Sequence, residues 1–145
     1  MAGGMGMKRW KWIAGIIIVL AVLVFALINL NTVSVNLRFA DKVVLEVEPY
    51  TYRNAFVTEI NQDDVETLKK IFSGRAWKDM PACPTGGVNL TFSSGGKSIT
   101  LYPAGDDCAT VRVVRNGQNY YFQNNDNDKM REILEKYGVV WPFGI

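Results

Sequence analysis

The two cysteines are the residues whose chemistry the sequence constrains most. Cys83 and Cys108 are the chain's only cysteines, and each flanks a segment with strand-like alternation. Outside the cytoplasm such thiols are free to oxidise to a disulfide. A redox-active pair usually has the close Cys-x-x-Cys spacing that lowers a thiol pKa, and this pair lacks it. We expect a structural disulfide. Two free thiols are the alternative, and a catalytic or metal role is the least favoured.

Histidine is absent from the sequence. Its absence excludes Ser–His and Cys–His nucleophilic catalysis and disfavours a zinc site built on two cysteines alone. The remaining paired carboxylates are Asp106 with Asp107, expected in a solvated turn, and Glu46 with Glu48, expected on the wet face of a strand. We predict no catalytic residue, metal or cofactor. An extracytoplasmic enzyme using carboxylates or lysine is the least favoured alternative.

One acidic cluster has a calcium-like spacing. Asn124, Asp126, Asp128 and Glu135 match positions 1, 3, 5 and 12 of an EF-hand loop. The sixth position, which should be glycine, is Lys129, and the residues after it already have helical periodicity. We interpret the cluster as the start of a helix.

Aromatic residues gather in the C-terminal half of the chain. In the two-residue alternation of a strand, Tyr120 and Tyr121 point to opposite faces, so at least one faces away from any packed helices. An exposed aromatic patch is typical of a partner surface. The candidates for such a surface are Trp77, Tyr120, Tyr121 and Trp141, with ordinary core packing as the alternative.

An apolar run near the N-terminus indicates where in the cell these residues lie. Trp12–Leu30 carries no charge, and its one strongly polar residue is Asn29. At about 1.5 Å of rise per residue, a helix of this length reaches roughly the 30 Å thickness of a bilayer's hydrocarbon core. The run predicts a transmembrane helix in contact with membrane lipid.

The residues before this run indicate its orientation. Lys8, Arg9 and Lys11 precede it, and Trp10 and Trp12 suit the lipid–water interface. Basic residues close to a span favour the cytoplasm. We expect a cytoplasmic N-terminus at residues 1–11, an anchor at 12–30 and an extracytoplasmic domain at 32–145.

A cleaved signal peptide is the alternative. Ile13–Val24 would serve as its hydrophobic region, and cleavage near Ala26 would release a secreted domain. The apolar run continues through Leu27, Ile28 and Leu30, which would be an awkward start for a soluble protein. The uncleaved anchor is therefore preferred, and both alternatives place the domain outside the cytoplasm.

The end of the apolar run and the segment after it resemble a known junction. Phe25–Asn29 followed by Val33–Leu37 is similar to small bacterial membrane proteins of the lipopolysaccharide-assembly A type. That family continues into a second spanning helix and this chain does not. The resemblance therefore implies no function here.

The charge balance argues against a nucleic-acid partner. Three of the 16 basic residues precede the span, which leaves 13 basic against 14 acidic residues in the domain. Nucleic-acid binding needs a basic face that gains from counterion release. We expect no nucleic-acid partner.

Strand and helix signals follow the span. Residues 33–39 and 43–47 alternate with a period of two and predict a hairpin, and residues 52–60 predict a third strand with Phe56 buried. A helix is expected to start at Asn61 and stop at Gly74.

The second half of the chain carries further strand, turn and helix signals. Residues 88–92, 97–102, 109–115 and 118–123 predict strands, and Asn116-Gly117 is a strong hairpin signal. A last helix is expected at residues 126–137, with an apolar tail packed back on the domain.

Together these signals predict an α+β fold: a transmembrane helix, then a small, mostly antiparallel sheet with two helices on one face. The expected function is non-catalytic binding or sensing of a protein or small ligand outside the membrane. The alternative is a structural or assembly role in a membrane complex.

Overall fold

The computed structural model describes residues 5–49, 54–79, 81 and 83–142. The chain divides into two compact units, residues 1–32 and residues 33–145. The elements in chain order are α1 (Met5–Asn31), β1 (Thr32–Val35), β2 (Lys42–Val47), β3 (Phe56–Glu59), α2 (Gln62–Ile71), β4 (Gly74–Trp77), β5 (Val88–Ser94), β6 (Lys97–Pro103), β7 (Thr110–Arg115), β8 (Gln118–Gln123) and α3 (Asn127–Lys136).

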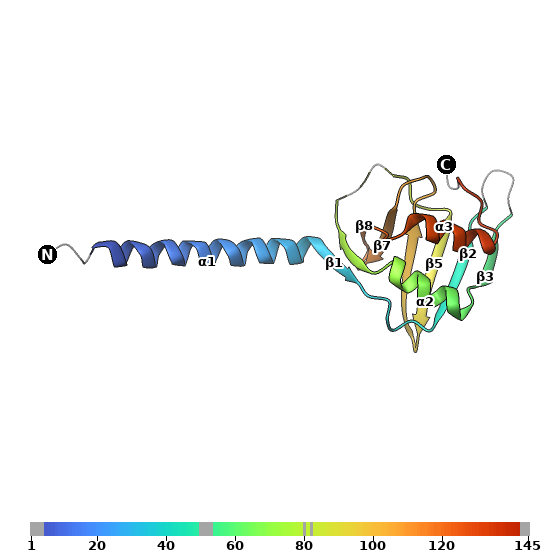
Figure 1. Cartoon of the computed structure of the whole chain (residues 1–145), viewed down its shortest axis with the longest axis horizontal. Coiled ribbons are helices and arrows are strands. Elements are labelled where there is room, and N and C mark those ends of the chain that lie inside the picture. The colour runs from blue at the N-terminus through green and yellow to red at the C-terminus, as the bar shows by residue number, and fades with distance from the viewer. Residues whose placement is uncertain (1–4, 50–53, 80, 82, 143–145) are drawn as a thin grey trace. The chain divides into compact units, whose positions relative to one another are not determined.

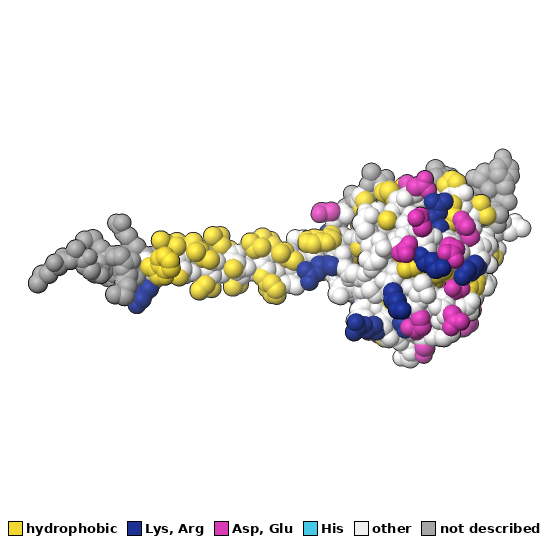
Figure 2. Space-filling model, in the orientation of Figure 1, with side chains coloured by type: hydrophobic (Ala, Val, Ile, Leu, Met, Phe, Trp, Pro, Cys, Tyr) yellow, Lys and Arg dark blue, Asp and Glu magenta, His cyan; other side chains and the backbone are white. Residues whose placement is uncertain are grey.

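Helix α1 exposes apolar side chains on every side. Its segment Trp10–Asn31 is long and apolar enough to cross a membrane. No residue in the most apolar 18-residue window of this segment is buried. Figure 2 shows this surface as almost continuously hydrophobic. The amides of Asn29 and Asn31 donate to the carbonyls of Phe25 and Leu27, at 2.8 and 3.0 Å, so the helix satisfies them itself. Such a helix is a membrane anchor or a signal sequence.

The second unit is built on an eight-stranded antiparallel sheet. The strand order is β1-β4-β8-β7-β6-β5-β2-β3. Helices α2 and α3 lie over one face of this sheet (Figure 1), and Figure 2 shows acidic and basic side chains interspersed over that side. The predicted fold class is confirmed.

The core lies between the sheet and the two helices. Phe72 at the end of α2 meets Phe92 of β5 edge-to-face, with ring centroids 6.1 Å apart. Each fully buried large apolar side chain contributes about 1.5–3 kcal/mol relative to exposure. The largest fully buried side chains include Phe72, Phe92, Leu37, Leu45, Leu68, Leu90, Leu101, Met130, Ile133 and Leu134.

Both helices begin at the capping residues that the sequence indicates. The Asn61 side chain accepts from the Asp64 amide at 2.9 Å, and Asp126 accepts from the Lys129 amide at 3.0 Å. These bonds satisfy amides that the first helical turn leaves unpaired. The calcium-like cluster is therefore a helix cap.

The Asn116-Gly117 turn is also as predicted. Both residues have positive φ, 50° and 75°. A two-residue turn of this kind matches the twist of the strands it joins. It sets the β7–β8 register from Arg115↔Gln118 to Thr110↔Gln123.

The predicted hairpin of residues 33–47 is wrong. β1 lies at one edge of the sheet beside β4, whereas β2 lies near the other edge between β5 and β3. The seven Cα–Cα intervals from Val35 to Lys42 span at most roughly 25 Å, and a flat sheet would separate the two strands by about 29 Å. The sheet must therefore curve, and the connection buries Leu37 and Ala40.

The predicted helix stop at Gly74 is wrong as well. Helix α2 ends at Ile71 with Phe72 as its cap, and Gly74 starts the unpredicted strand β4. In β4 the buried side chain is Ala76, so no alternation of large apolar residues marked this strand.

Two other expectations are met in part. β3 begins at Phe56, which packs partly buried against the core, while residues 50–53 lie outside the described residues. In the tail, Val139 is buried and Trp141 packs against the core, and Phe143 lies outside the described residues.

Candidate functional site

One face of the sheet is left uncovered by α2 and α3. Cross-strand register places Tyr102, Arg112, Tyr121 and Trp77 side by side on four neighbouring strands of this face. The Arg112 guanidinium lies 4.2 Å from the centre of the Tyr102 ring, a cation–π contact. Its Nε atom is buried and has no hydrogen-bond partner among the described residues.

A hollow opens on this face over β4, β8 and β7. Its volume is about 330 Å³. The pairing Trp77↔Tyr121 places Arg75 opposite Gln123, which in turn pairs with Thr110. We call it the open-face hollow; it is lined by Arg75, Trp77, Asp79, Pro81, Thr110, Tyr121, Phe122 and Gln123.

The polar groups of the open-face hollow are only partly satisfied. Thr110 is 1% exposed, and its Oγ1 accepts from Gln123 Nε2 at 3.4 Å. In the described part of the chain, the Thr110 hydroxyl hydrogen has no acceptor, and neither Arg75 nor Asp79 forms an ion pair. The hollow thus presents a cation, an anion, a buried hydroxyl donor and an indole ring.

The disulfide fixes one wall of the open-face hollow. Cys83 and Cys108 are bonded, with Cα atoms 6.2 Å apart, so the predicted pairing is present. The bond ties the loop that carries Asp79 and Pro81 to the residues just before Thr110. A bridge between Thr85 and Ala104 holds the same loop to the end of β6.

The cysteines also lie beside a carboxylate. The two sulfurs and an Asp106 oxygen are within 4.8 Å of one another, a spacing that a metal ion could span. Metal coordination by cysteine requires a thiolate, and the disulfide leaves none. In its oxidised form this group therefore offers no thiolate ligand.

A second hollow, of about 430 Å³, contains the Asp106-Asp107 pair. Asp106 Oδ1 accepts from the Cys108 amide at 3.0 Å, and Asp107 Oδ1 accepts from Arg131 Nη1 at 2.5 Å. Arg131 also lies 5.1 Å from the centre of the Trp141 ring. The carboxylates here are already partnered within the domain, whereas Arg75 and Asp79 form no ion pair in the part of the chain that the structure describes.

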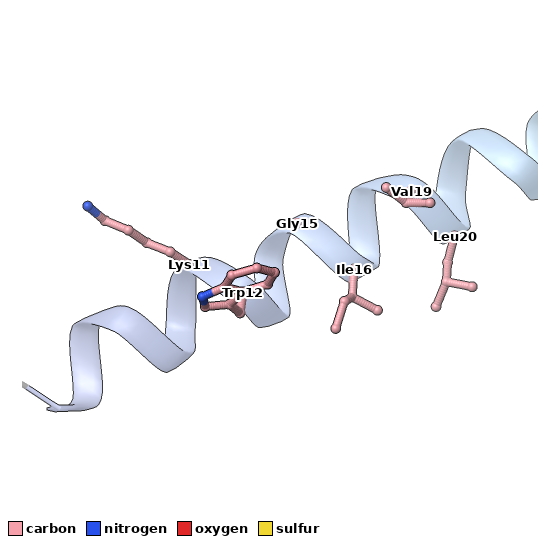
Figure 3. Close-up of a pocket in the computed structure, with 6 residues that line it drawn as sticks. All are labelled: Lys11, Trp12, Gly15, Ile16, Val19 and Leu20. Atoms are coloured by element: carbon pink, nitrogen blue, oxygen red, sulfur yellow. The ribbon is translucent and has the colours of Figure 1, made fainter.

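Two further surfaces are hollowed. Between Arg38 and α2, Lys69 Nζ donates to Glu66 Oε1 at 2.8 Å and to the Ala40 carbonyl at 2.9 Å. Along α1, Trp12, Ile16 and Leu20 stand off a single helix (Figure 3). Only α1 residues line this apolar groove, so it is a lipid-facing surface if α1 spans a membrane.

A network of hydrogen bonds joins α2 to α3. Asp64 is buried, which raises its pKa, but bonds from Tyr137, Lys136 and Asn61 outweigh this effect and leave that pKa below its ordinary value. Burial, together with the adjacent carboxylate of Asp64, raises the pKa of Tyr137. The network connects two helices and lines none of the hollows described above.

The structure brings together two of the four predicted surface aromatics. Trp77 and Tyr121 share the open-face hollow, while Tyr120 lies on the opposite side of β8 against the core and Trp141 lies in the second hollow. Trp10 and Trp12 are exposed on α1 with Lys11. Lys8 and Arg9 also lie in α1, but their side chains are outside those described.

Sequence reasoning missed the polar half of the open-face hollow, which comprises Arg75, Asp79, Thr110 and Gln123. A signal for part of it was available. The Asn116-Gly117 turn alone places Thr110 opposite Gln123 and Arg112 opposite Tyr121. The strand β4 was not predicted, and its pairing with β8 is what brings Arg75 and Trp77 beside these residues.

In comparisons with known proteins, the chain matches no protein-family model, no curated protein and no solved structure.

Proposed function

We propose that the protein is a single-pass membrane protein whose outer domain binds a ligand in the open-face hollow without catalysis. The observation that carries this proposal is the hollow itself. Arg75, Asp79 and Trp77 line it on the sheet face that α2 and α3 leave uncovered. A concave site with a few convergent polar groups is the usual form of a ligand site.

The membrane topology rests on the N-terminal segment. Lys8, Arg9 and Lys11 lie together at the N-terminal end of the span Trp10–Asn31. The next charged residue along the chain is Arg38. This asymmetry favours a cytoplasmic N-terminus. The Cys83–Cys108 disulfide supports an oxidising compartment for the domain. Secretion after cleavage near Ala26 is the alternative.

Binding is favoured over catalysis by the groups that the hollow contains. The carboxylate of Asp79 is exposed on the loop after β4, and no second carboxylate lines the hollow among the described residues. General acid–base catalysis usually requires a pair of titratable groups in distinct environments. A cation, an anion and an aromatic ring are sufficient for recognition.

A second candidate function is assembly of a membrane complex through α1. The uniform apolar surface of that helix favours it, since another spanning helix could pack against any side. Gly15, with no heavy atom near its missing Cβ, would permit close approach there.

Site-specific photo-crosslinking separates the two functions. A photoreactive benzophenone amino acid replaces Trp77 in the open-face hollow, Val114 on the same face outside it, or Ile16 in α1 of the full chain. Val114 is 42% and Trp77 43% exposed, so the first two positions are matched in accessibility. The chain is irradiated in membranes, and adducts are mapped by mass spectrometry.

Ligand binding in the hollow predicts an adduct at position 77 that is absent at position 114. An adduct confined to position 16 would favour assembly through the anchor. Equal labelling at positions 77 and 114 would show that the hollow has no preference over its surrounding face, and would contradict the proposal.

A further inference from the structure

We infer that the ligand of the open-face hollow is a small zwitterion, either an α-amino acid or a dipeptide. This inference rests on the proposed function and adds the chemical class of the ligand. It comes from two opposite charges that form no ion pair within the described residues, from the row of donors beside one of them, and from the size of the hollow.

The two charges make the hollow complementary to a dipolar molecule. The planar guanidinium of Arg75 matches a carboxylate in a bidentate pair, and the Asp79 carboxylate accepts from an ammonium group. Neither is consumed by an ion pair within the described residues. A ligand with one charge would leave one of these two groups unmatched, whereas a zwitterion matches both.

The strand register gives the bound molecule a direction. Arg75, Gln123 and Thr110 lie side by side on three adjacent strands, and all three can donate to an oxyanion. The buried Thr110 hydroxyl has a hydrogen to donate, and Gln123 retains one amide hydrogen beyond its bond to Thr110. The ligand carboxylate therefore belongs at this row.

The opposite end of the hollow is suited to the rest of the molecule. Trp77 and Tyr121 form the next row, and the loop after Trp77 carries Asp79. Aromatic rings offer apolar contact to a ligand side chain and attract a cation to their faces. The ammonium group therefore lies toward Asp79, with the ligand's apolar atoms over Trp77.

The volume limits the size of the ligand. About 330 Å³ corresponds to about eleven water molecules at roughly 30 Å³ each. A solute of about that many non-hydrogen atoms is an amino acid or a dipeptide. A longer peptide would exceed this volume and extend out of the hollow into solvent.

Calorimetric titration of the full chain in lipid nanodiscs tests this inference. The probes are the twenty L-amino acids and a set of alanyl dipeptides, each compared with its N-acetylated, C-amidated form. Blocking removes both charges and keeps the side chains. We expect the tightest free probe to bind at least about tenfold more strongly than its blocked form, a difference of about 1.4 kcal/mol.

Variants locate the effect in the hollow. Arg75→Gln and Asp79→Asn should each weaken binding of that probe by about tenfold or more. Arg115→Gln and Glu135→Gln remove the same charges at exposed positions outside the hollow and should stay within about twofold. All four changes are at exposed side chains, and unchanged thermal unfolding verifies that each variant is folded.

The outcomes distinguish this inference from the proposed function. Equal affinity for free and blocked probes, or unchanged affinity in Arg75→Gln and Asp79→Asn, overturns the zwitterion. If no free probe binds but a neutral oligosaccharide panel binds and loses affinity in Trp77→Ala, the zwitterion is overturned and the hollow remains a ligand site. If neither panel binds and position 77 yields no specific adduct, both are overturned.

Discussion

The Tyr137 hydroxyl donates to Asp64 Oδ2 at 2.9 Å, joining the end of α3 to the first turn of α2 across 73 residues of chain. The same hydroxyl accepts from the Asn61 amide at 3.0 Å. Lys136 Nζ lies 3.3 Å from the other Asp64 oxygen. These bonds fix the first turn of α2 against the end of α3.

Tyr137→Phe tests what this contact contributes. The change keeps the ring and removes a hydrogen bond to a charged group, so we expect the free energy of unfolding to fall by about 1.5–3 kcal/mol. Denaturant titration at pH 7 measures it. Tyr102→Phe is the matched control, because no hydrogen bond of its hydroxyl is found within the described residues, and it should change stability by less than about 0.5 kcal/mol.

The acid dependence of stability should depend on Asp64. Its pKa lies below the ordinary value of 3.8 in the folded state, so its contribution is present above that value and is lost as pH falls through the lowered pKa. Asp64→Asn should therefore lose stability at pH 7 and show a flatter decline below pH 4 than the unmodified chain. Asp63→Asn, at an exposed neighbour, should retain the steeper decline.

The alkaline dependence has the opposite sign. The pKa of Tyr137 is raised above 10.0 in the folded state, so its neutral form is stabilised by folding. That contribution is complete below the ordinary pKa and is lost as pH rises through the raised value. Unfolding measured from pH 9 to 12 should decline less steeply in Tyr137→Phe than in the unmodified chain. An identical decline would show that Tyr137 does not carry this effect.

Removing the disulfide should destabilise the domain and loosen the hollow. Cys83 and Cys108 are 25 residues apart, and closing a loop of that length is worth about 3.5 kcal/mol on the chain-entropy model. The double change Cys83→Ser, Cys108→Ser should lower the free energy of unfolding by about that amount. Amide exchange should rise at Asp79 and neighbouring loop residues. Unchanged exchange there would contradict the role assigned to the disulfide as the support of that wall.

The β7–β8 turn provides a test of local backbone chemistry. Gly117 has φ of 75°, which side chains with a Cβ rarely adopt. Gly117→Ala should lower stability by about 1 kcal/mol, whereas Asn116→Gly should change it little because glycine accepts the same conformation. Denaturant titration of both variants measures the difference, and equal effects would contradict the assigned turn.

Local signals in the sequence predict much of this fold. Asn61 and Asp126 start helices because a short polar side chain there satisfies unpaired amides, and Asn116-Gly117 turns because both residues accept positive φ. Such choices depend on a few neighbouring residues. The predicted hairpin of residues 33–47 failed because strand pairing depends on distant parts of the chain, and β4, the true neighbour of β1, is four residues long with one buried side chain.

The open-face hollow was harder to predict for the same reason. Trp77 and Tyr121 were candidates as exposed aromatics, and their contact requires the β4–β8 pairing. Arg75 and Asp79 belong to no distinguishing motif; what singles them out is that they share the hollow and form no ion pair within the described residues. Tyr120 and Trp141 had the same residue chemistry as the other two aromatics but lie elsewhere.

Thiol labelling of intact cells that express the full chain tests the central claim most directly. A membrane-impermeant maleimide is applied before and after an impermeant reductant, and the membrane fraction is then analysed. An outward domain held by an uncleaved α1, with Cys83 bonded to Cys108, predicts no labelling at first and labelling of both cysteines in the membrane-bound chain after reduction. Labelling of both without reductant, labelling only after cell lysis, or a labelled chain found in the medium would contradict it.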